Sequence, residues 1–219
     1  MTGRTGDPRV IHTRVIHQVA SVLLGYPDER LYDARPVLTG AVAGLPAGQA
    51  AKRLAVFLAH LDRTPLAEAA AHYVEVFDLK RRCCPYLTYF TYGDTRKRGM
   101  ALLRFKHAYR LAGFEIDGDE LPDHLAVVCE LSGRGATREA VRLLREHRPG
   151  VELLLRALEA EGSPYADVVA AVLATLPELG PRDRAALLKL ATEGPPPAED
   201  VGLEPYDLAA MGGSMGGNR

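Results

Sequence analysis

Apolar residues recur along this chain at the spacing of an α-helix. Ile11, Val15 and Val19 lie four residues apart, so they fall on one side of a helix. This pattern predicts a first helix from about residue 9 to residue 24. Gly-Tyr-Pro at 25–27 supplies the residues that end a helix.

The same period continues through most of the chain. Thr64 followed by Pro65 predicts a helix start with a capping hydroxyl; we also expect Asp94 to cap a helix that ends at Gly113, and Pro122 to open the next one. Further helices are predicted over 29–42, around 54–61, from 66 past 77, and over 137–147, 151–161, 164–176 and 183–191. The pattern therefore predicts an all-α, single-domain bundle of about ten helices, with antiparallel neighbours joined by short turns.

One stretch departs from the helical pattern. Residues 85–92, with the sequence PYLTYFTY, are rich in aromatic and β-branched side chains, which favour strands. No second convincing strand is available to pair with it. We therefore expect a short helix or an extended segment there.

The two ends differ in composition from the body. Residues 194–219 are rich in Gly, Pro and small side chains, which bury too little apolar area to become ordered. The predicted organisation is a flexible N-terminus at 1–8, a helical domain at 9–193 and a disordered tail at 194–219. Within the tail, the more apolar residues 201–208 could dock on the body or on a partner.

Composition and cysteine content also predict where in the cell the protein is found. With 47% hydrophobic and 25% charged residues and a net charge of -1, the chain is typical of a soluble globular protein. No apolar run approaches the roughly 18 residues of a membrane span, and the N-terminus lacks the apolar region of a secretory signal. Three cysteines at positions 83, 84 and 129 form no disulfide framework. We expect a cytoplasmic protein.

Charge is sorted along the sequence although the total is near zero. Residues 80–110 hold nine Lys or Arg and one acid, whereas 115–130 hold six acids and no Lys or Arg. This predicts a surface with a positive and a negative side. Arg96 and Arg98 fall in the first turn of a helix, where the helix dipole disfavours cations. We favour intramolecular ion pairs for them; the alternative is a nucleic-acid contact supported by stacking tyrosines.

Catalytic signatures are missing. The chain contains no GxxxxGK[ST], GxGxxG or HExxH motif; GGSMG at 212–216 has the GxSxG spacing but lies in the Gly-rich tail. A metal site using His124 and Cys129 is a weaker alternative, because residues five apart do not share a helix face. A reactive thiol at Cys83 or Cys84, beside three cations, is another.

Two local features suggest a binding surface. Gly99 inside a helix costs up to about 1 kcal/mol relative to Ala, and its expected purpose is the close approach of another helix. The sequence from Glu120 to His124 looks like a helix start. Its acids also predict a negative lip beside the apolar face of Leu125 and Val128, which suits a basic and hydrophobic peptide.

Three motifs, in order, carry a resemblance to a known family. They are YVEVFD at 73–78, YGDTRKRG at 92–99 and ELPDHL at 120–125. Together they resemble the NarJ-type assembly chaperones of respiratory nitrate reductase, which are related to the TorD- and DmsD-like redox enzyme maturation proteins. LGYPD at 24–28 is similar to the end of the first helix in that family. The resemblance covers roughly residues 10–190.

The resemblance implies a non-enzymatic, all-helical cytoplasmic chaperone. Such a protein would bind the N-terminal segment of the nitrate reductase alpha subunit, or the alpha-beta complex, and hold it competent for molybdenum cofactor insertion and membrane assembly. It implies no permanently bound cofactor, no nucleic-acid partner and no stable membrane insertion; a different molybdenum oxidoreductase as client is the alternative. The positions associated with the peptide groove or its support are Tyr73, Phe77, Arg96, Arg98, Gly99, Glu120, Pro122, Asp123 and His124. For Tyr73 and Phe77 we expect a core role first.

Overall fold

The computed structural model describes residues 7–116 and 120–196 of the chain. Within these ranges the protein is helical, apart from loops and one isolated β-bridge. The α-helices are α1 (Pro8–Leu23), α2 (Glu29–Ala43), α3 (Gln49–Leu61), α4 (Leu66–Tyr73), α5 (Tyr89–Tyr92), α6 (Arg96–Leu111), α7 (Leu125–Gly133), α8 (Thr137–Glu146), α9 (Arg148–Ala160), α10 (Tyr165–Leu173) and α11 (Pro181–Glu193). The predicted all-α bundle of about ten helices is therefore confirmed.

The ends of the chain leave part of the predicted organisation untested. Residues 1–6 and 197–219 lie outside the described residues, so the expected flexible N-terminus and disordered tail stay predictions. In the ranges that are described, no helix is both long and apolar enough to pass through a bilayer.

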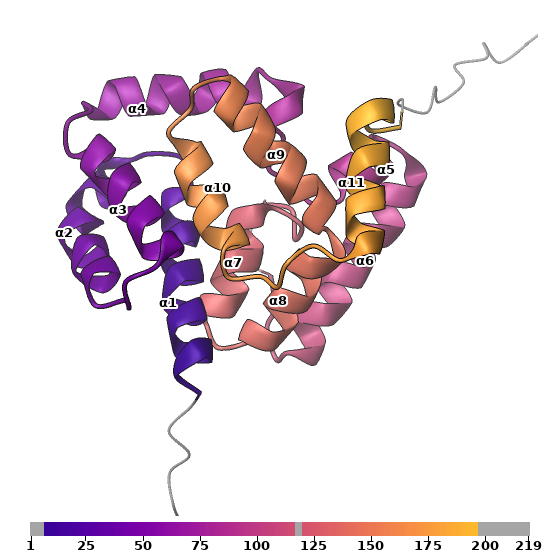
Figure 1. Cartoon of the computed structure of the whole chain (residues 1–219), viewed down its shortest axis with the longest axis horizontal. Coiled ribbons are helices and arrows are strands. Elements are labelled where there is room, and N and C mark those ends of the chain that lie inside the picture. Colours follow the sequence, from indigo (N-terminus) through magenta and orange to yellow (C-terminus); the bar gives the residue numbers. More distant parts are fainter. Residues whose placement is uncertain (1–6, 117–119, 197–219) are drawn as a thin grey trace, which may run out of the picture.

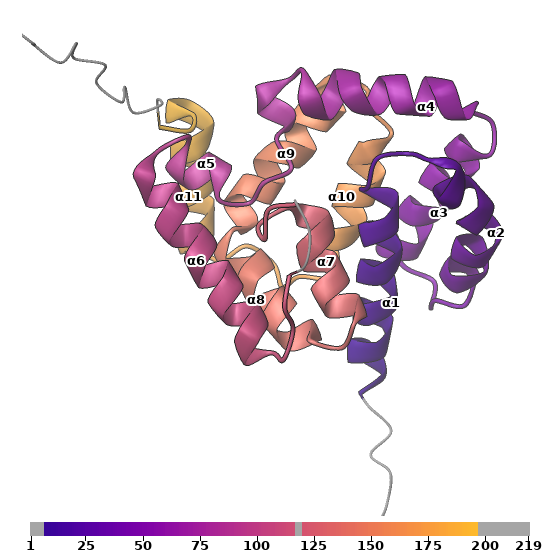
Figure 2. The same ribbon diagram turned by 180° about the vertical axis from the view of Figure 1, so that it is seen from behind.

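The helices surround α1 and α7, which pack against each other at the centre (Figure 1). Helices α2 and α3 lie on one side of α1, and α6, α8 and α11 lie on the other side of the molecule, while α4 crosses one end. The reverse view in Figure 2 shows the same arrangement, with α6 on the outside next to α8. Segments far apart in sequence, such as α1 and α7, thus share one core.

The core follows directly from the apolar spacing. Leu23, Leu54, Leu125 and Val128 are completely buried, and removing each such side chain from water contributes about 1.5–3 kcal/mol. Gly133 of α7 lets α1 come close, because a Cβ there would lie 2.0 Å from Oε1 of Gln18.

The carbonyl of Gly133 also receives a hydrogen bond from Nε of Arg14, at 2.8 Å. An arginine of α1 thus satisfies a carbonyl at the end of α7 that has no partner within its own helix.

Three predicted helix starts were wrong in detail. Thr64 donates its hydroxyl back to the carbonyl of His60 at 2.9 Å and caps nothing. Asp94 is engaged in ion pairs, and Thr95 takes the N-cap position of α6. Pro122 does not open α7. The helix begins three residues later, because 121–124 form a turn, closed by the hydrogen bond from the His124 N–H to the Leu121 carbonyl at 3.0 Å, and His124 then pairs with Tyr86.

The ambiguous aromatic stretch contains both predicted forms. Tyr86 forms the antiparallel bridge with His124, and Tyr89–Tyr92 forms the single turn α5. Tyr86 therefore pairs as a strand residue does, although the segment around His124 has no strand pattern of its own.

Candidate functional site

The two most distinctive motif regions meet at the bridge between Tyr86 and His124. Leu87 donates its N–H to the carbonyl of Asp123, and Leu125 donates to the carbonyl of Pro85, both at 2.9 Å. These bonds hold 85–87 antiparallel to 123–125 around the bridge. Residues nearly forty positions apart therefore build one site.

A buried carboxylate lies at the centre of this site. Asp123 is 0% exposed, and its Oδ2 accepts hydrogen bonds from the backbone N–H and the hydroxyl of Thr88, at 3.1 and 2.5 Å. Nη2 of Arg98 lies 4.0 Å from the same oxygen. Since a buried charge requires hydrogen bonds and a counter-charge, this network fixes the position of the 85–88 segment.

Arg98 connects the buried network to the surface. Its Nε donates to the Thr88 hydroxyl at 3.2 Å, and Nη1 donates to Asp94 at 3.1 Å. The guanidinium carbon also lies 5.4 Å from the centre of the Tyr86 ring. The prediction of intramolecular pairing is confirmed for Arg98, whose side chain is only 16% exposed. Arg96 lies exposed in the first turn of α6.

Other residues of the motif around Asp123 face in different directions. Pro122 is buried, and its carbonyl accepts from the hydroxyl of Tyr109 at 3.2 Å. His124 is the N-cap of α7, with Nδ1 accepting the Ala126 N–H at 3.1 Å. Burial lowers the pKa of His124, so its neutral ring suits the capping role.

Glu120 is the member of this motif that faces solvent. Its Oε1 accepts from the hydroxyl of Tyr86 and from the N–H of Leu121, both at 2.9 Å. Desolvation and this carboxylate together raise the pKa of Tyr86, so the phenol remains a hydrogen-bond donor.

The predicted negative lip needs correction. Asp123 cannot belong to a rim because it is fully buried, and Leu125 and Val128 offer no open apolar face because both are 0% exposed. A hollow of about 180 Å³ does exist nearby. Its lining includes three apolar side chains, three carboxylates and one cation: Phe114, Ile116, Val127, Glu115, Glu120, Glu130 and Arg134. Of the acids in this segment, Asp117 and Asp119 lie outside the described residues.

The two motif aromatics belong to a ring cluster and do not line this hollow. The Tyr73 and Phe77 centroids are 4.8 Å apart, and each ring packs on Tyr165 of α10, at 5.8 and 4.9 Å. The Tyr73 hydroxyl donates to the Leu24 carbonyl at 3.3 Å, and burial raises its pKa to about 12. Both residues support the core, as expected.

Gly99 does not have the predicted role. It is exposed, and no atom of the described residues outside its own helix turn comes within 4 Å of the position of a Cβ. No second helix approaches there, and nothing in the structure explains the glycine.

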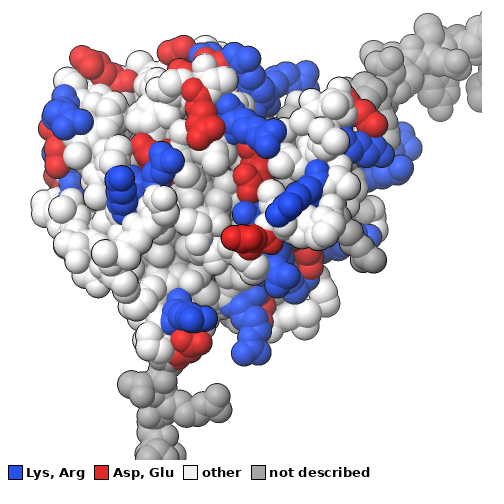
Figure 3. Space-filling view, viewed as in Figure 1, with Lys and Arg blue, Asp and Glu red and all other residues white. Residues whose placement is uncertain are grey.

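The first cations of the basic stretch pair with acids of the same chain. Lys80 contacts Glu75 at 2.9 Å and Glu161 at 2.5 Å, Arg82 also pairs with Glu161, and Arg81 pairs with Asp94. Figure 3 shows cationic and anionic side chains lying next to one another on the face it displays.

The tyrosines of 86–92, which could stack on nucleic-acid bases, are packed within the fold. Tyr89 is buried, and Tyr86 and Tyr92 are only partly exposed. Rings packed in this way offer no stacking platform, so the geometry does not favour the nucleic-acid alternative.

The thiol and metal alternatives gain no support. Burial raises the pKa of Cys83 and Cys129, and raises that of Cys84 to about 11. A raised pKa means less thiolate, which is the opposite of a reactive cysteine. Among the described residues, no group of three or more His, Cys, Asp or Glu side chains could hold a metal ion.

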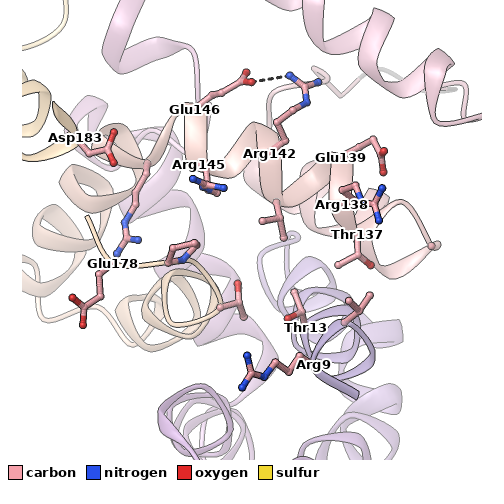
Figure 4. Close-up of a pocket in the computed structure, with 16 residues that line it drawn as sticks. Arg9, Thr13, Thr137, Arg138, Glu139, Arg142, Arg145, Glu146, Glu178 and Asp183 are labelled. Carbon is pink, nitrogen blue, oxygen red and sulfur yellow. Dashed lines mark hydrogen bonds and ion pairs between the residues drawn. The ribbon is translucent and has the colours of Figure 1, made fainter. Parts of the chain in front are cut away.

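Sequence reasoning missed a large cleft of about 1010 Å³ that is lined by residues of α1, α8 and α11. Figure 4 shows Arg138, Arg142 and Arg145 of α8 around this space, with Arg9 of α1 across from them. The available signal was the arginine spacing of four and three on α8, which puts the three side chains on one helix face. Arg142 pairs with Glu146 at 2.7 Å.

Comparison with known proteins gives consistent matches. Residues 44–171, which include all nine motif positions, match the family described as nitrate reductase delta subunit.

Three relatives illustrate the range of these matches. The nitrate reductase-like protein NarX of Mycobacterium tuberculosis is 38% identical over 161 residues, which is 74% of this chain and 24% of that protein. The probable nitrate reductase molybdenum cofactor assembly chaperone NarJ of Bacillus subtilis is 29% identical over 78% of this chain and 92% of its own length. The corresponding Escherichia coli K12 chaperone NarJ is 32% identical, over 68% of this chain and 64% of its own length. The chain thus spans about a quarter of the length of the mycobacterial relative.

Proposed function

The chain belongs to the nitrate reductase delta subunit family, and we propose that it is a NarJ-type assembly chaperone. Relatives named as nitrate reductase molybdenum cofactor assembly chaperones support this proposal. In the proposed role the protein catalyses no reaction and holds no permanent cofactor. It acts in the cytoplasm on nitrate reductase before the molybdenum cofactor is inserted.

The proposed client segment is the N-terminus of the catalytic alpha subunit, either alone or in the alpha-beta complex. Such a segment, basic at one end and hydrophobic along its length, fits a surface with carboxylates around an apolar floor. The observation that carries this proposal is the hollow beside Glu120, where Glu115 and Glu130 surround Phe114 and Val127.

The size of the hollow defines what enters it. About 180 Å³ is below the 300–1,000 Å³ of a typical small-molecule site. It accommodates one or two side chains, so the rest of the peptide lies on the surrounding surface. Asp123, Arg98, Pro122 and His124 act beneath this surface by fixing the 85–88 and 121–125 segments.

Calorimetry with a synthetic peptide of the alpha-subunit N-terminus tests the site. We expect Glu115→Gln with Glu120→Gln to weaken binding about fivefold at low salt, because two exposed ion pairs contribute about 1 kcal/mol together. Raising the salt concentration should reduce the difference between the variant and the wild type, since salt screens exposed charges.

The matched control replaces two exposed acids that do not line the hollow, Glu68→Gln with Glu159→Gln. Equal affinities for both double variants and the wild type would remove the acidic hollow from the proposal.

The chaperone role is tested separately by a pull-down from cells respiring nitrate without oxygen. Recovery of a different molybdenum oxidoreductase would change the client, and recovery of none would argue against the role.

A further inference from the structure

Helix α6 exposes an apolar stripe that the proposed function does not use. Met100, Leu103 and Leu111 are 62%, 58% and 76% exposed. Their spacing of three and eight residues places them along one side of the helix. A helix of a globular domain normally turns such a stripe towards the core, so this one indicates an interaction surface.

The stripe borders a groove of about 540 Å³ between α6 and α8. Tyr92, Phe105 and Leu143 contribute to its lining. The groove runs beside the stripe for much of α6, and from Met100 to Leu111 the helix rises about 17 Å.

The charge of this groove distinguishes it from the acidic hollow. Arg104 and His107 of α6 and Arg142 of α8 line it, and its one acid, Glu146, is paired with Arg142 at 2.7 Å. Over its whole length α6 contains six Lys or Arg and no Asp or Glu. A basic client leader is disfavoured here, whereas an apolar segment carrying acids is complementary.

The described chain ends next to this groove. After α11, Gly194 takes a positive φ of 71°, and the carbonyl oxygen of Pro196 lies where a Cβ on Gly93 would be only 2.2 Å away. Gly93 precedes the first residue of α6 by three positions. In Figures 1 and 2 the end of α11 lies beside α5, at the same end of the molecule.

The sequence that follows has the required chemistry. Residues 199–208, EDVGLEPYDL, contain four acids, no Lys or Arg, and four large apolar side chains. The five residues from 197 to 201 reach up to about 17 Å when extended, which carries the chain from Gly93 onto α6.

We propose that residues 201–208 dock in the groove between α6 and α8. Their apolar side chains cover Met100, Leu103 and Leu111, and their carboxylates, with those of Glu199 and Asp200, lie near Arg104 and Arg142. A segment tethered this closely has an effective concentration on the order of 1 mM. Any external acidic segment that uses the groove must therefore compete with it.

Oxidation of Met100 by hydrogen peroxide tests the docking. Met100 is the sole methionine among residues 7–116 and 120–196, and Met211 and Met215 serve as reference sites in the same chain. We expect Leu203→Ser with Leu208→Ser to increase the rate of sulfoxide formation at Met100 about fivefold. The matched control, Leu188→Ser, changes an α11 side chain that is 67% exposed and lies outside the groove; it should leave the rate unchanged.

A carbodiimide cross-link supplies the second measurement. Lys97 precedes Met100 by one helix turn, and we expect it to form an amide with Glu199, Asp200 or Glu204 within one chain. Cross-linking a mixture of isotopically labelled and unlabelled protein distinguishes a groove filled by the tail of the same chain from one filled by the tail of a second copy. Links between labelled and unlabelled chains would assign the groove to a second copy and overturn the proposal, as would equal Met100 oxidation rates in the tail variant and the wild type.

Discussion

The carboxylate of Asp123 allows the sharpest test of how the motif residues act. If Asp123 is structural, its replacement should lower stability before it affects binding. Asp123→Ala removes the acceptor for both hydrogen bonds from Thr88 and the counter-charge near Arg98. Asp123→Asn keeps the shape, removes the charge and replaces the second carboxylate oxygen with an NH2 group.

The expected magnitudes follow from these contacts. Removing one partner of a buried charge pair costs about 3–5 kcal/mol, so Asp123→Ala should lose roughly that much. Hydrogen bonds to a charged group contribute about 1.5–3 kcal/mol and neutral ones about 0.5–1.5 kcal/mol. The Asn variant, which retains neutral bonds to Thr88, should therefore lose about 2 kcal/mol.

Thermal unfolding followed by circular dichroism is a suitable assay. For a chain of this size each kcal/mol shifts Tm by about 2–4 °C, so the Ala variant should unfold roughly 6–20 °C lower. The matched control, Glu130→Ala, removes a half-exposed carboxylate from the same segment and should stay within about 0.5 kcal/mol of the wild type.

One result would refute this reasoning. An Asp123→Ala protein that unfolds at the wild-type temperature but no longer binds the alpha-subunit peptide would make Asp123 a ligand contact. In the expected case, Arg98→Met should show a coupling of at least 0.5 kcal/mol with Asp123→Asn in a double-mutant cycle, because the two residues share one network.

Three further predictions concern buried groups elsewhere. Burial lowers the pKa of His17 to about 4, so the folded protein resists protonation of this ring. The free energy of unfolding should be highest above pH 6.5 and should fall by up to about 3 kcal/mol as the pH drops towards 4. Urea unfolding at several pH values should show a shallower fall for His17→Gln. Gly133→Leu should cost about 1–3 kcal/mol by pushing α1 away at Gln18. Gly133→Ala requires the Gln18 side chain to turn and its Cβ, at 3.0 Å, to move slightly, so it should lower the unfolding temperature less than Gly133→Leu. Cys84, with a pKa of about 11, should react with iodoacetamide at pH 7.5 about a hundredfold more slowly than a thiol of pKa 9, and a rate equal to that of free cysteine would contradict its burial.

The apolar period was sufficient to predict the helices. The first helix, expected over 9–24, is Pro8–Leu23, and the helix expected over 137–147 is Thr137–Glu146. Helix formation depends on neighbours three and four residues away, and Gly and Pro end helices through their own backbone geometry. Both kinds of information are present in a short window of sequence.

The motif residues show where this local information ends. The sequence placed Asp123 on a helix start and an acidic lip, because Pro122 precedes it and acids surround it. Thr88 lies 35 positions away, and its hydrogen bonds with Asp123 exist only once 85–88 and 121–125 pair. Glu161 likewise neutralises Lys80 from 81 residues away.

The surfaces were decided entirely by packing. Whether a carboxylate lines a hollow or lies beneath it depends on which helices cover it, and Glu120 and Asp123 are only three residues apart yet have opposite environments. The groove beside Met100 likewise requires α6 and α8 to lie together. Sequence therefore determined the helices of this protein through short-range spacing, and tertiary contacts between distant residues determined which side chains remain available to a partner.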